Sequence, residues 1–423
     1  MKPQTRVFVV GGGHSTFMGR ARPEFIHRRH PDFGSKQNPT IQDHLADALR
    51  ETYDVTGVDP SLIDKVYLSN FLGETFLKQG HLSALLVDVE PAFDGKPIAR
   101  IEAACASGSS AIAACIDALQ GGCETAMAVG AEIETNVPGR DGIEYMAYAA
   151  HMEKQRQLDT YIFPYFFARR AKAYCDEFGA SMDDIAHVVA KAYANANRNP
   201  RALHRTTTMS YDFARTPSDK NYLFVEDEEL KPYIRLTDCT AFTDGASAVV
   251  LATEDGLRRL NISPADCTEI LAYGHSVAPL AQTADPYRLA NMRRAALQAY
   301  SDAGIGGDAM QIAEVHDCFA VAEIQMYEAL ELCDEGQGHR LLTNGHTQID
   351  GRIPVNTGGG LLGFGHPIGA TGIKQVVEIW RQMKGHCGDY QVSSRPEYGV
   401  SANLGGDDRT GVVMVHRNVS TES

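Results

Sequence analysis

The chain has 423 residues, of which 43% are hydrophobic and 22% are charged, so a sizeable globular core is expected. The formal net charge of −15 argues against general binding to nucleic acids or anionic membranes, which requires clustered Lys and Arg. No apolar run approaches the length of about 18 residues that suggests a membrane span. The apolar run at 7–10 is too short for a signal peptide.

The nine cysteines are an odd number, and no two of them have Cys-x-x-Cys spacing. We therefore expect neither a disulfide framework nor a structural zinc site, and no bound metal. Free thiols are typical of a reducing compartment, which favours a cytoplasmic protein.

The first 130 residues are predicted to alternate between strands and helices. Predicted strands lie at 7–10, at 65–69, from about 98 and at 126–130, and a predicted helix covers about 40–56. A further helix begins near Gly108, where the spacing i, i+3, i+4, i+7 gives one apolar face made of Ile112, Cys115, Ile116 and Leu119.

Residues 131–236 differ from the rest of the chain, because they are rich in Tyr, Arg, Asn and Pro and show no clear alternation. We interpret them as an inserted loop domain that covers a site. The pattern resumes with a strand at 246–251. The expected division is an N-terminal half of 1–130 plus about 237–265, the insertion, and a C-terminal half of 266–423.

The second half follows the same plan as the first. A strand at 312–315 precedes a helix, and a Gly-rich run at 356–372 precedes another helix with Ile373, Val376, Val377 and Trp380 on one face. Strands at 398–404 and 411–416 flank a Gly-Gly turn. This recurrence predicts a duplicated α/β fold with functional residues at the C-terminal ends of strands.

Cys105 is the first candidate catalytic residue. It lies between a predicted strand and a helix and is followed by the small residues 106–110, which permit a sharp turn. The N-terminus of a helix lowers the pKa of a thiol, and the thiolate is the nucleophilic form. The alternative is a small buried cysteine with a purely structural role.

His366 lies at a second junction of this kind. A residue before proline is pushed out of helical geometry, and Pro367 can begin the next helix. The imidazole is therefore presented where it can accept a thiol proton. A structural histidine bonded to carbonyl groups of the loop is the alternative.

His316 and Cys318 form a third junction, directly after the strand at 312–315. His316 can donate a hydrogen bond to a thioester oxygen, and Cys318 can move a proton at carbon. A simple helix start is the alternative interpretation of this tetrapeptide.

The run Gly358 to Gly363 formally matches the G-x-G-x-x-G pattern of dinucleotide sites. His366 and Pro367 separate it from the helix, and Glu378 falls inside that helix and not after a following strand. Tight packing around a site explains these glycines better.

Together these motifs resemble the thiolase superfamily, above all its sterol-carrier-protein-X-like branch, which includes acetoacetyl-CoA thiolases. The resemblance extends over nearly the whole chain. It rests on four short motifs in the right order, at 104–108, 244–248, 316–319 and 365–367. It implies a thiolase fold, in which two duplicated βαβαβαββ halves form a five-layered αβαβα core with an inserted covering loop domain.

The resemblance also implies roles for the candidate residues. Cys105 corresponds to the nucleophile that becomes acylated, and His366 to the base that activates it. His316, with a water, corresponds to the donor for the thioester oxygen, and Cys318 to the acid/base at carbon. Other thiolases have that second cysteine near the C-terminus, where this chain has Asn403.

The backbone N–H groups of Cys105 and Gly405 are expected to form the oxyanion hole, with Gly406 as the alternative to Gly405. His316 is expected to donate a hydrogen bond to the other oxygen, that of the thioester. Gly365 and Asn403 are expected to lie near the site. The resemblance implies acyl-CoA as substrate and no permanently bound cofactor.

A basic cluster in the covering segment is expected to meet the phosphates of coenzyme A, although a solvated basic face is the simpler alternative. Its members are Lys191, Arg198, Arg201, His204 and Arg205.

The leading hypothesis is an acetyl-CoA acyltransferase that makes or cleaves a short β-ketoacyl-CoA. The alternatives are a thiolase-fold subunit for a bulky acyl-CoA, working by thiolysis or retro-aldol cleavage with a small zinc- and OB-fold-containing partner, and a catalytically silent scaffold. The resemblance also implies a homodimer or a dimer of dimers.

Overall fold

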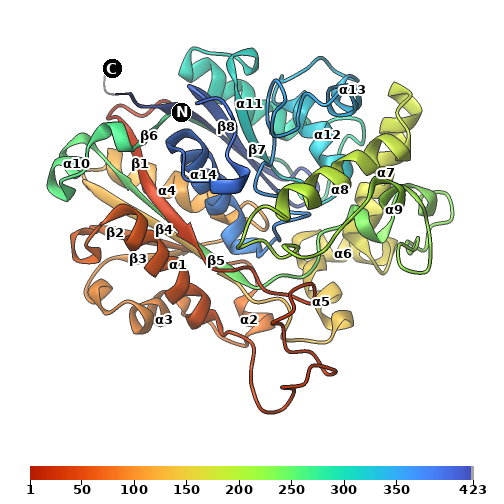
Figure 1. The fold of residues 1–423 in the computed structure, drawn as a ribbon, viewed down its shortest axis with the longest axis horizontal. Coiled ribbons are helices and arrows are strands. Elements are labelled where there is room, and N and C mark those ends of the chain that lie inside the picture. The colour runs from red at the N-terminus through yellow and green to blue at the C-terminus, as the bar shows by residue number, and fades with distance from the viewer. Residues whose placement is uncertain (421–423) are drawn as a thin grey trace.

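The computed structural model describes residues 1–420 as an α/β protein built around one nine-stranded sheet (Figure 1). The strand order is β3-β2-β4-β5-β1-β6-β9-β8-β7. The strands of the first half are β1 (Val7–His14), β2 (Lys65–Ser69), β3 (Ile98–Ile101), β4 (Thr125–Glu132) and β5 (Gly245–Ala252). Those of the second half are β6 (Thr268–Val277), β7 (Ile312–Val315), β8 (Tyr398–Gly405) and β9 (Thr410–Asn418).

The two halves of the sheet repeat one pairing scheme. In the first half, β1 is antiparallel to β5, β5 is antiparallel to β4, and β4 and β3 flank β2 in parallel. In the second half, β6, β9 and β8 are successively antiparallel, and β7 is parallel to β8. A parallel bridge from Ala313 to Val355 lies where β3 lies in the first half. The duplication predicted from the sequence is therefore present.

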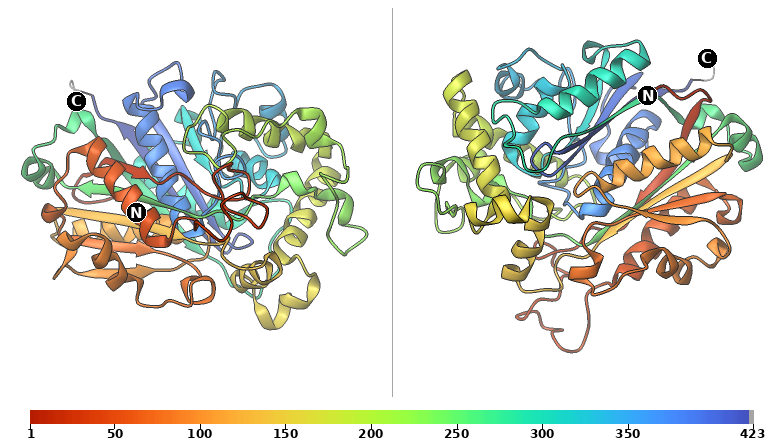
Figure 2. Two further views of the ribbon diagram at one scale, coloured as in Figure 1. Left: turned by 60° about the horizontal axis from the view of Figure 1, so that its bottom comes forward. Right: turned by 180° about the vertical axis from the view of Figure 1, so that it is seen from behind.

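The helices form three layers around the two half-sheets (Figure 2). Between the half-sheets lie α4 (Ser107–Gln120) and α14 (Ile368–Lys384), and outside the first half lie α1 (Ile41–Thr56) and α3 (Leu82–Val89). Outside the second half lie α11 (Ala290–Ala303), α12 (Ala320–Ala329) and α13 (Gly338–Thr343). The remaining short helices of the halves are α2 (Gly73–Phe76) and α10 (Glu254–Leu260). This is the five-layered αβαβα core.

Strand β1 shows why both faces of the sheet carry helices. Its side chains alternate, so that Val7 and Val9 pack toward α4 and α14 while Phe8 and Val10 pack toward α1 and α3. All eight residues of the strand are buried, as expected for a strand covered on both faces.

Helices α4 and α14 cross at two glycines, and this crossing sets the geometry of the site. A Cβ atom on Gly108 would lie 2.8 Å from the backbone nitrogen of Gly372, closer than real Cβ contacts come. Only glycine therefore permits this approach, which brings the N-terminal ends of the two helices together.

The covering segment 131–236 is largely helical, which differs from the irregular structure expected for it. It contains α5 (Gly139–Met146), α6 (Met152–Gln155), α7 (Ile162–Phe178), α8 (Met182–Ala196) and α9 (Tyr211–Arg215). Apolar residues of α7 and α8 join the core cluster of the second half. The ring of Phe167 on α7 stacks on Phe319 at 4.3 Å between centroids, so this segment packs directly over the third junction.

Candidate active site

Cys105 lies on a tight turn between β3 and α4. The preceding residue, Ala104, has φ +50°, a conformation that non-glycine residues rarely adopt and that costs of order 1–2 kcal/mol. The Ser107 hydroxyl fixes the turn, because it accepts a hydrogen bond from the Ala103 N–H at 2.9 Å and donates one to the Ala104 carbonyl at 2.6 Å. The turn leaves Cys105 partly exposed.

The electrostatic setting of Cys105 differs from the sequence prediction. Burial raises the pKa of the thiol to about 12, although the Gly406 N–H hydrogen-bonds to it and opposes this shift. The negative charges of Glu134 and Glu132 raise the pKa further. Helix α4 begins at Ser107, two residues later, and the expected lowering of the pKa is wrong. The resting thiol is neutral, so nucleophilic attack requires a base.

His366 provides a nitrogen lone pair in a defined orientation. Its Nδ1 lies 2.6 Å from the Thr371 hydroxyl, and that hydroxyl donates its own proton to the Pro367 carbonyl at 3.0 Å. Thr371 must therefore accept from His366 Nδ1–H, which leaves Nε2 as the unprotonated nitrogen. Burial lowers the pKa of His366 to about 3, so the ring is neutral at rest.

The backbone around His366 is fixed on both sides. Gly365 has φ +116°, and Pro367 is the N-cap residue of α14, one position before the first turn predicted for it. Two buried carboxylates accept the first N–H groups of this helix: Glu134 from Ile368 and Glu132 from Gly369, each at 3.1 Å. Neither Glu132 nor Glu134 is marked by a local signal in the sequence.

His316 has the opposite tautomer. It follows β7 directly, and the Asn403 amide on β8 donates to its Nδ1 at 2.9 Å, so the ring proton is on Nε2. Burial lowers the pKa of His316 well below its usual value, as does the charge of His366. His316 is thus a neutral ring that donates from Nε2.

Cys318 is buried, and its thiol pKa lies well above the usual value because of burial, with the charge of Cys105 as the next cause. The N–H of Thr240, just after the covering segment, donates to the Cys318 carbonyl at 3.1 Å and fixes this backbone.

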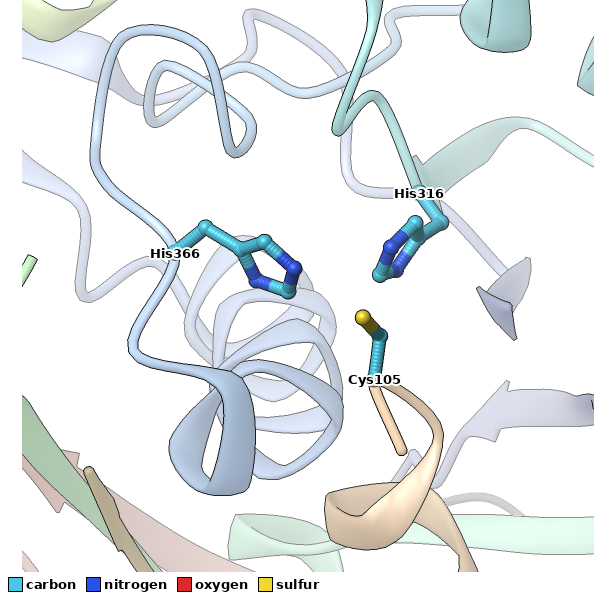
Figure 3. Close-up of side chains that lie close together, drawn as sticks. All are labelled: Cys105, His316 and His366. Carbon is cyan, nitrogen blue, oxygen red and sulfur yellow. The ribbon is translucent and has the colours of Figure 1, made fainter. Parts of the chain in front are cut away.

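The three junctions converge on one point (Figure 3). Cys105, His316 and His366 each offer a donor atom, and these atoms all lie within 4.8 Å of one another. The two imidazole rings are nearly perpendicular, at 86°, with centroids 5.0 Å apart. Among residues 1–420, neither Nε2 has a hydrogen-bond partner. The cluster thus combines a thiol, an acceptor and a donor that face a common space.

The Gly-Gly segment at the end of β8 supplies backbone donors. The N–H that reaches the Cys105 sulfur belongs to Gly406, one residue beyond the predicted Gly405. Gly405 lies at the end of β8 opposite Thr410, and a Cβ atom there would lie 2.5 Å from the Ala103 carbonyl oxygen. The segment therefore packs directly against the Cys105 turn.

The Gly-rich run at 358–363 wraps around Asp317, the residue after His316. The Asp317 carboxylate accepts from the Leu361 N–H at 2.6 Å and the Leu362 N–H at 3.3 Å, and a Cβ atom on Gly360 would collide with it. This is the tight packing predicted for these glycines.

The basic cluster is mostly unavailable to a ligand. Lys191 is fully buried and forms an ion pair with Glu323 at 2.5 Å, so the prediction that it binds coenzyme A is wrong. Arg201 pairs with Asp47 and Glu51, at 3.3 and 2.8 Å. His204 is buried too. The sequence shows that these residues are basic but not that carboxylates distant in sequence neutralise two of them.

Arg198 is exposed and Arg205 is partly exposed, and neither forms an ion pair with another residue of the described chain. Within residues 1–420, they are the two arginines of the cluster without a carboxylate partner.

No helix within residues 1–420 has the length and apolar character needed to cross a membrane. All nine cysteines are free thiols in the structure.

Two family models match the chain: "Thiolase, N-terminal domain" over residues 29–255 and "Thiolase C-terminal domain-like" over residues 272–418. An acetyl-CoA acetyltransferase of Methanothermobacter thermautotrophicus is 32% identical over 90% of this chain and 96% of its own length. The benzoylsuccinyl-CoA thiolase subunit BbsB of Thauera aromatica is 27% identical over 97% of each chain.

Sterol carrier protein 2 of Bos taurus is 27% identical over 92% of this chain and 68% of its own length. Among solved structures, the Ltp2-ChsH2(DUF35) aldolase has a similar fold, with a TM-score of 0.76, 18% identity and 99% coverage of both chains. Family models, relatives and fold agree with the four motifs, and the chain therefore belongs to the thiolase superfamily, in its sterol-carrier-protein-X-like branch, as a thiolase-type acyltransferase.

Proposed function

We propose that the enzyme transfers acyl groups through a thioester on Cys105, and that the convergence of Cys105, His316 and His366 within 4.8 Å carries this assignment. His366 Nε2 takes the proton of the Cys105 thiol while the sulfur attacks the thioester carbon. The coenzyme A thiolate then leaves and receives that proton, and an acyl-cysteine remains. A neutral thiol beside a neutral imidazole suits this concerted transfer.

The carbon–carbon step uses the other two residues. His316 Nε2–H donates to the thioester oxygen on which enolate charge develops, so it stabilises the transition state more than the ground state. In cleavage, the Cys318 thiol gives its proton to the α-carbon as the carbon–carbon bond breaks, and the His366 imidazolium, which holds the proton of Cys105, reprotonates the Cys318 thiolate. Synthesis runs the same transfers in reverse. The N–H groups of Cys105 and Gly406 stabilise the tetrahedral intermediate on the cysteine.

The substrate is a β-ketoacyl-CoA with a short acyl group such as acetoacetyl-CoA, as the acetyl-CoA acetyltransferase relative suggests. The acyl group on Cys105 would lie among apolar side chains, which favours an uncharged acyl group. These side chains are Phe71, Leu72, Phe76, Ala149 and Ile368. Arg198 and Arg205 are the candidates for contact with the phosphates.

A bulky acyl-CoA is the second candidate substrate, because a relative of nearly equal coverage is a subunit of a benzoylsuccinyl-CoA thiolase. A small partner protein of the zinc- and OB-fold-containing kind is supported by two similar proteins, because BbsB is one subunit of its thiolase and the Ltp2-ChsH2(DUF35) aldolase combines two proteins. We further propose a cytoplasmic homodimer. The complete catalytic cluster disfavours a silent scaffold.

Mass spectrometry after mixing with acetyl-CoA tests the acyl-enzyme. We expect an acetyl-sized mass increase that peptide mapping places on Cys105, and none in Cys105→Ala. The partly buried Cys175 provides a matched control, since Cys175→Ala should be acetylated as the wild type is. An unmodified protein, or a label on another residue, would contradict the proposal.

A cleavage assay separates the candidate reactions. Breakdown of acetoacetyl-CoA that requires free coenzyme A indicates thiolysis, whereas cleavage of a bulky β-hydroxyacyl-CoA without coenzyme A indicates retro-aldol chemistry. Cys318→Ala should keep the acetylation of Cys105 and lose carbon–carbon bond cleavage. Normal turnover in that variant would refute the role of Cys318.

A further inference from the structure

We propose that the unacylated active site binds Zn²⁺, when it is supplied, through Cys105 Sγ and the Nε2 atoms of His316 and His366, and that the bound metal blocks acylation. The first observation is the donor set itself. One sulfur and two ring nitrogens lie within 4.8 Å of one another, and a thiolate with two imidazoles is a set that suits zinc.

The distances need only a small adjustment. Zinc–sulfur bonds of about 2.3 Å and zinc–nitrogen bonds of about 2.0 Å in tetrahedral geometry separate the ligand atoms by roughly 3.5 Å. Contraction from the observed separations therefore requires shifts of about 1 Å or less, which side-chain rotation supplies.

The second observation is that two buried polar atoms face the cluster without a partner. Among residues 1–420, Nε2 of His316 and Nε2 of His366 have no hydrogen-bond partner, although both rings are at least nine-tenths buried. Buried polar groups in native proteins nearly always have partners, and these two nitrogens face the same thiol, where a single ligand can satisfy both.

The third observation is that both rings are held from behind. Metal-binding histidines usually have a hydrogen bond on the other ring nitrogen. His366 Nδ1 donates to Thr371 at 2.6 Å, as this arrangement requires. His316 Nδ1 lies 2.9 Å from the Asn403 amide, which must turn to present its oxygen so that Nε2 becomes free to bind the metal.

Access also favours a bound metal. The partial exposure of Cys105 leaves a fourth position for water. As the zinc–sulfur bond forms, the thiol proton leaves to solvent, so the metal occupies both the nucleophile and the base. An acylated Cys105 has no thiolate to offer.

The test is titration of the full chain with Zn²⁺ by calorimetry. His27 and His30 lie on an exposed loop with ring centroids 6.2 Å apart and offer a competing surface site, so the titration uses a His27→Ala/His30→Ala background. We expect one equivalent per chain. Changing Cys105, His316 or His366 to Ala should weaken binding about tenfold or more, while Cys175→Ala should leave it unchanged.

Co²⁺ gives a second measurement that needs no variant. A sulfur-to-cobalt charge-transfer band should appear on binding and disappear when acetyl-CoA acylates the protein first. The proposal would be overturned if all three ligand variants bound Zn²⁺ as tightly as the His27→Ala/His30→Ala background. Bound Co²⁺ without a thiolate band would overturn it too. Neither result would contradict the proposal of an acyl-enzyme, because acetylation of Cys105 is measured without metal.

Discussion

The Cys105 turn and the His366 turn occupy equivalent places in the two halves of the molecule, and they differ in how they are held. Each lies just before one of the two helices, α4 and α14, that cross at Gly108 and Gly372. The Cys105 turn has a strained Ala104 and remains partly exposed. His366 is buried, and hydrogen bonds from its ring and from the following helix hold it.

The two turns therefore meet different needs, which are access of substrate to Cys105 and a fixed orientation of the His366 ring. A nucleophile must be reached by a large thioester, so its turn is open on one side. A base acts on that nucleophile alone, so its ring can be buried and fixed in one tautomer, and positioning of this kind contributes much of the catalytic rate. The duplicated scaffold brings the two turns together, and the contacts around each turn assign its role.

Removing the base should have the largest effect. His366→Ala is expected to slow acetylation of Cys105 by about 10²–10⁴-fold, because no other group is placed to take the thiol proton. Quench-flow mass spectrometry with acetyl-CoA measures the rate. Added imidazole should restore part of it, whereas Cys318→Ala should acetylate normally. Fast acetylation in His366→Ala would assign the base elsewhere.

Reversing the tautomer of His316 should have the next largest effect. In Asn403→Asp, the new carboxylate accepts a hydrogen bond from His316 Nδ1–H. The ring therefore keeps its orientation, but Nε2 loses its proton and no longer donates. We expect carbon–carbon bond cleavage to fall by about 10²-fold while acetylation changes little. Steady-state thiolysis and single-turnover acetylation measure the two steps. An equal loss in both would contradict a role confined to the enolate.

The contrast between the turns also explains what the sequence could reveal. Cys105, His316 and His366 each stand beside glycine, proline or small residues at a strand-to-helix junction, and such local signals predict where a side chain is presented. The order of the motifs then identified the family and the duplicated, layered fold. These inferences depend on neighbours in sequence.

The contacts that set proton positions depend on residues far apart in the chain. Asn403 and His316 are 87 positions apart, and Lys191 and Glu323 are 132 apart. The sequence therefore could not reveal the tautomer of His316 or the burial of Lys191. A one-residue difference in the turn after β8 likewise decides between Gly405 and Gly406, and no local pattern resolves it.

A smaller effect is expected from the support behind His366. Thr371→Val keeps the volume of the side chain but removes the acceptor for Nδ1–H, so the ring can exchange tautomers and lose its orientation. Acetylation should slow by about tenfold, the effect typical of removing the hydrogen-bond partner behind a functional histidine. Thr371→Ser is the matched control and should acetylate at nearly the wild-type rate. Equal rates in the two variants would show that packing alone orients the ring.

The smallest effect is the one expected from pH. With a His366 pKa of about 3 and a Cys105 pKa of about 12, the neutral pair persists between pH 6 and 9. The single-turnover acetylation rate should therefore stay within about twofold across that range, and an ordinary histidine with a pKa of about 6.5 would instead impose an inflection.

The buried base should also appear in the pH dependence of stability. The folded pKa of His366 lies below its value in the unfolded chain, so its contribution favours the fold above about pH 6.5 and is lost as the pH falls toward 3. His366→Gln should therefore melt with a weaker dependence on pH between 6.5 and 4 than the wild type. Parallel melting curves would mean that the ring titrates in the fold as it does in the unfolded chain, which would contradict a lowered pKa for His366.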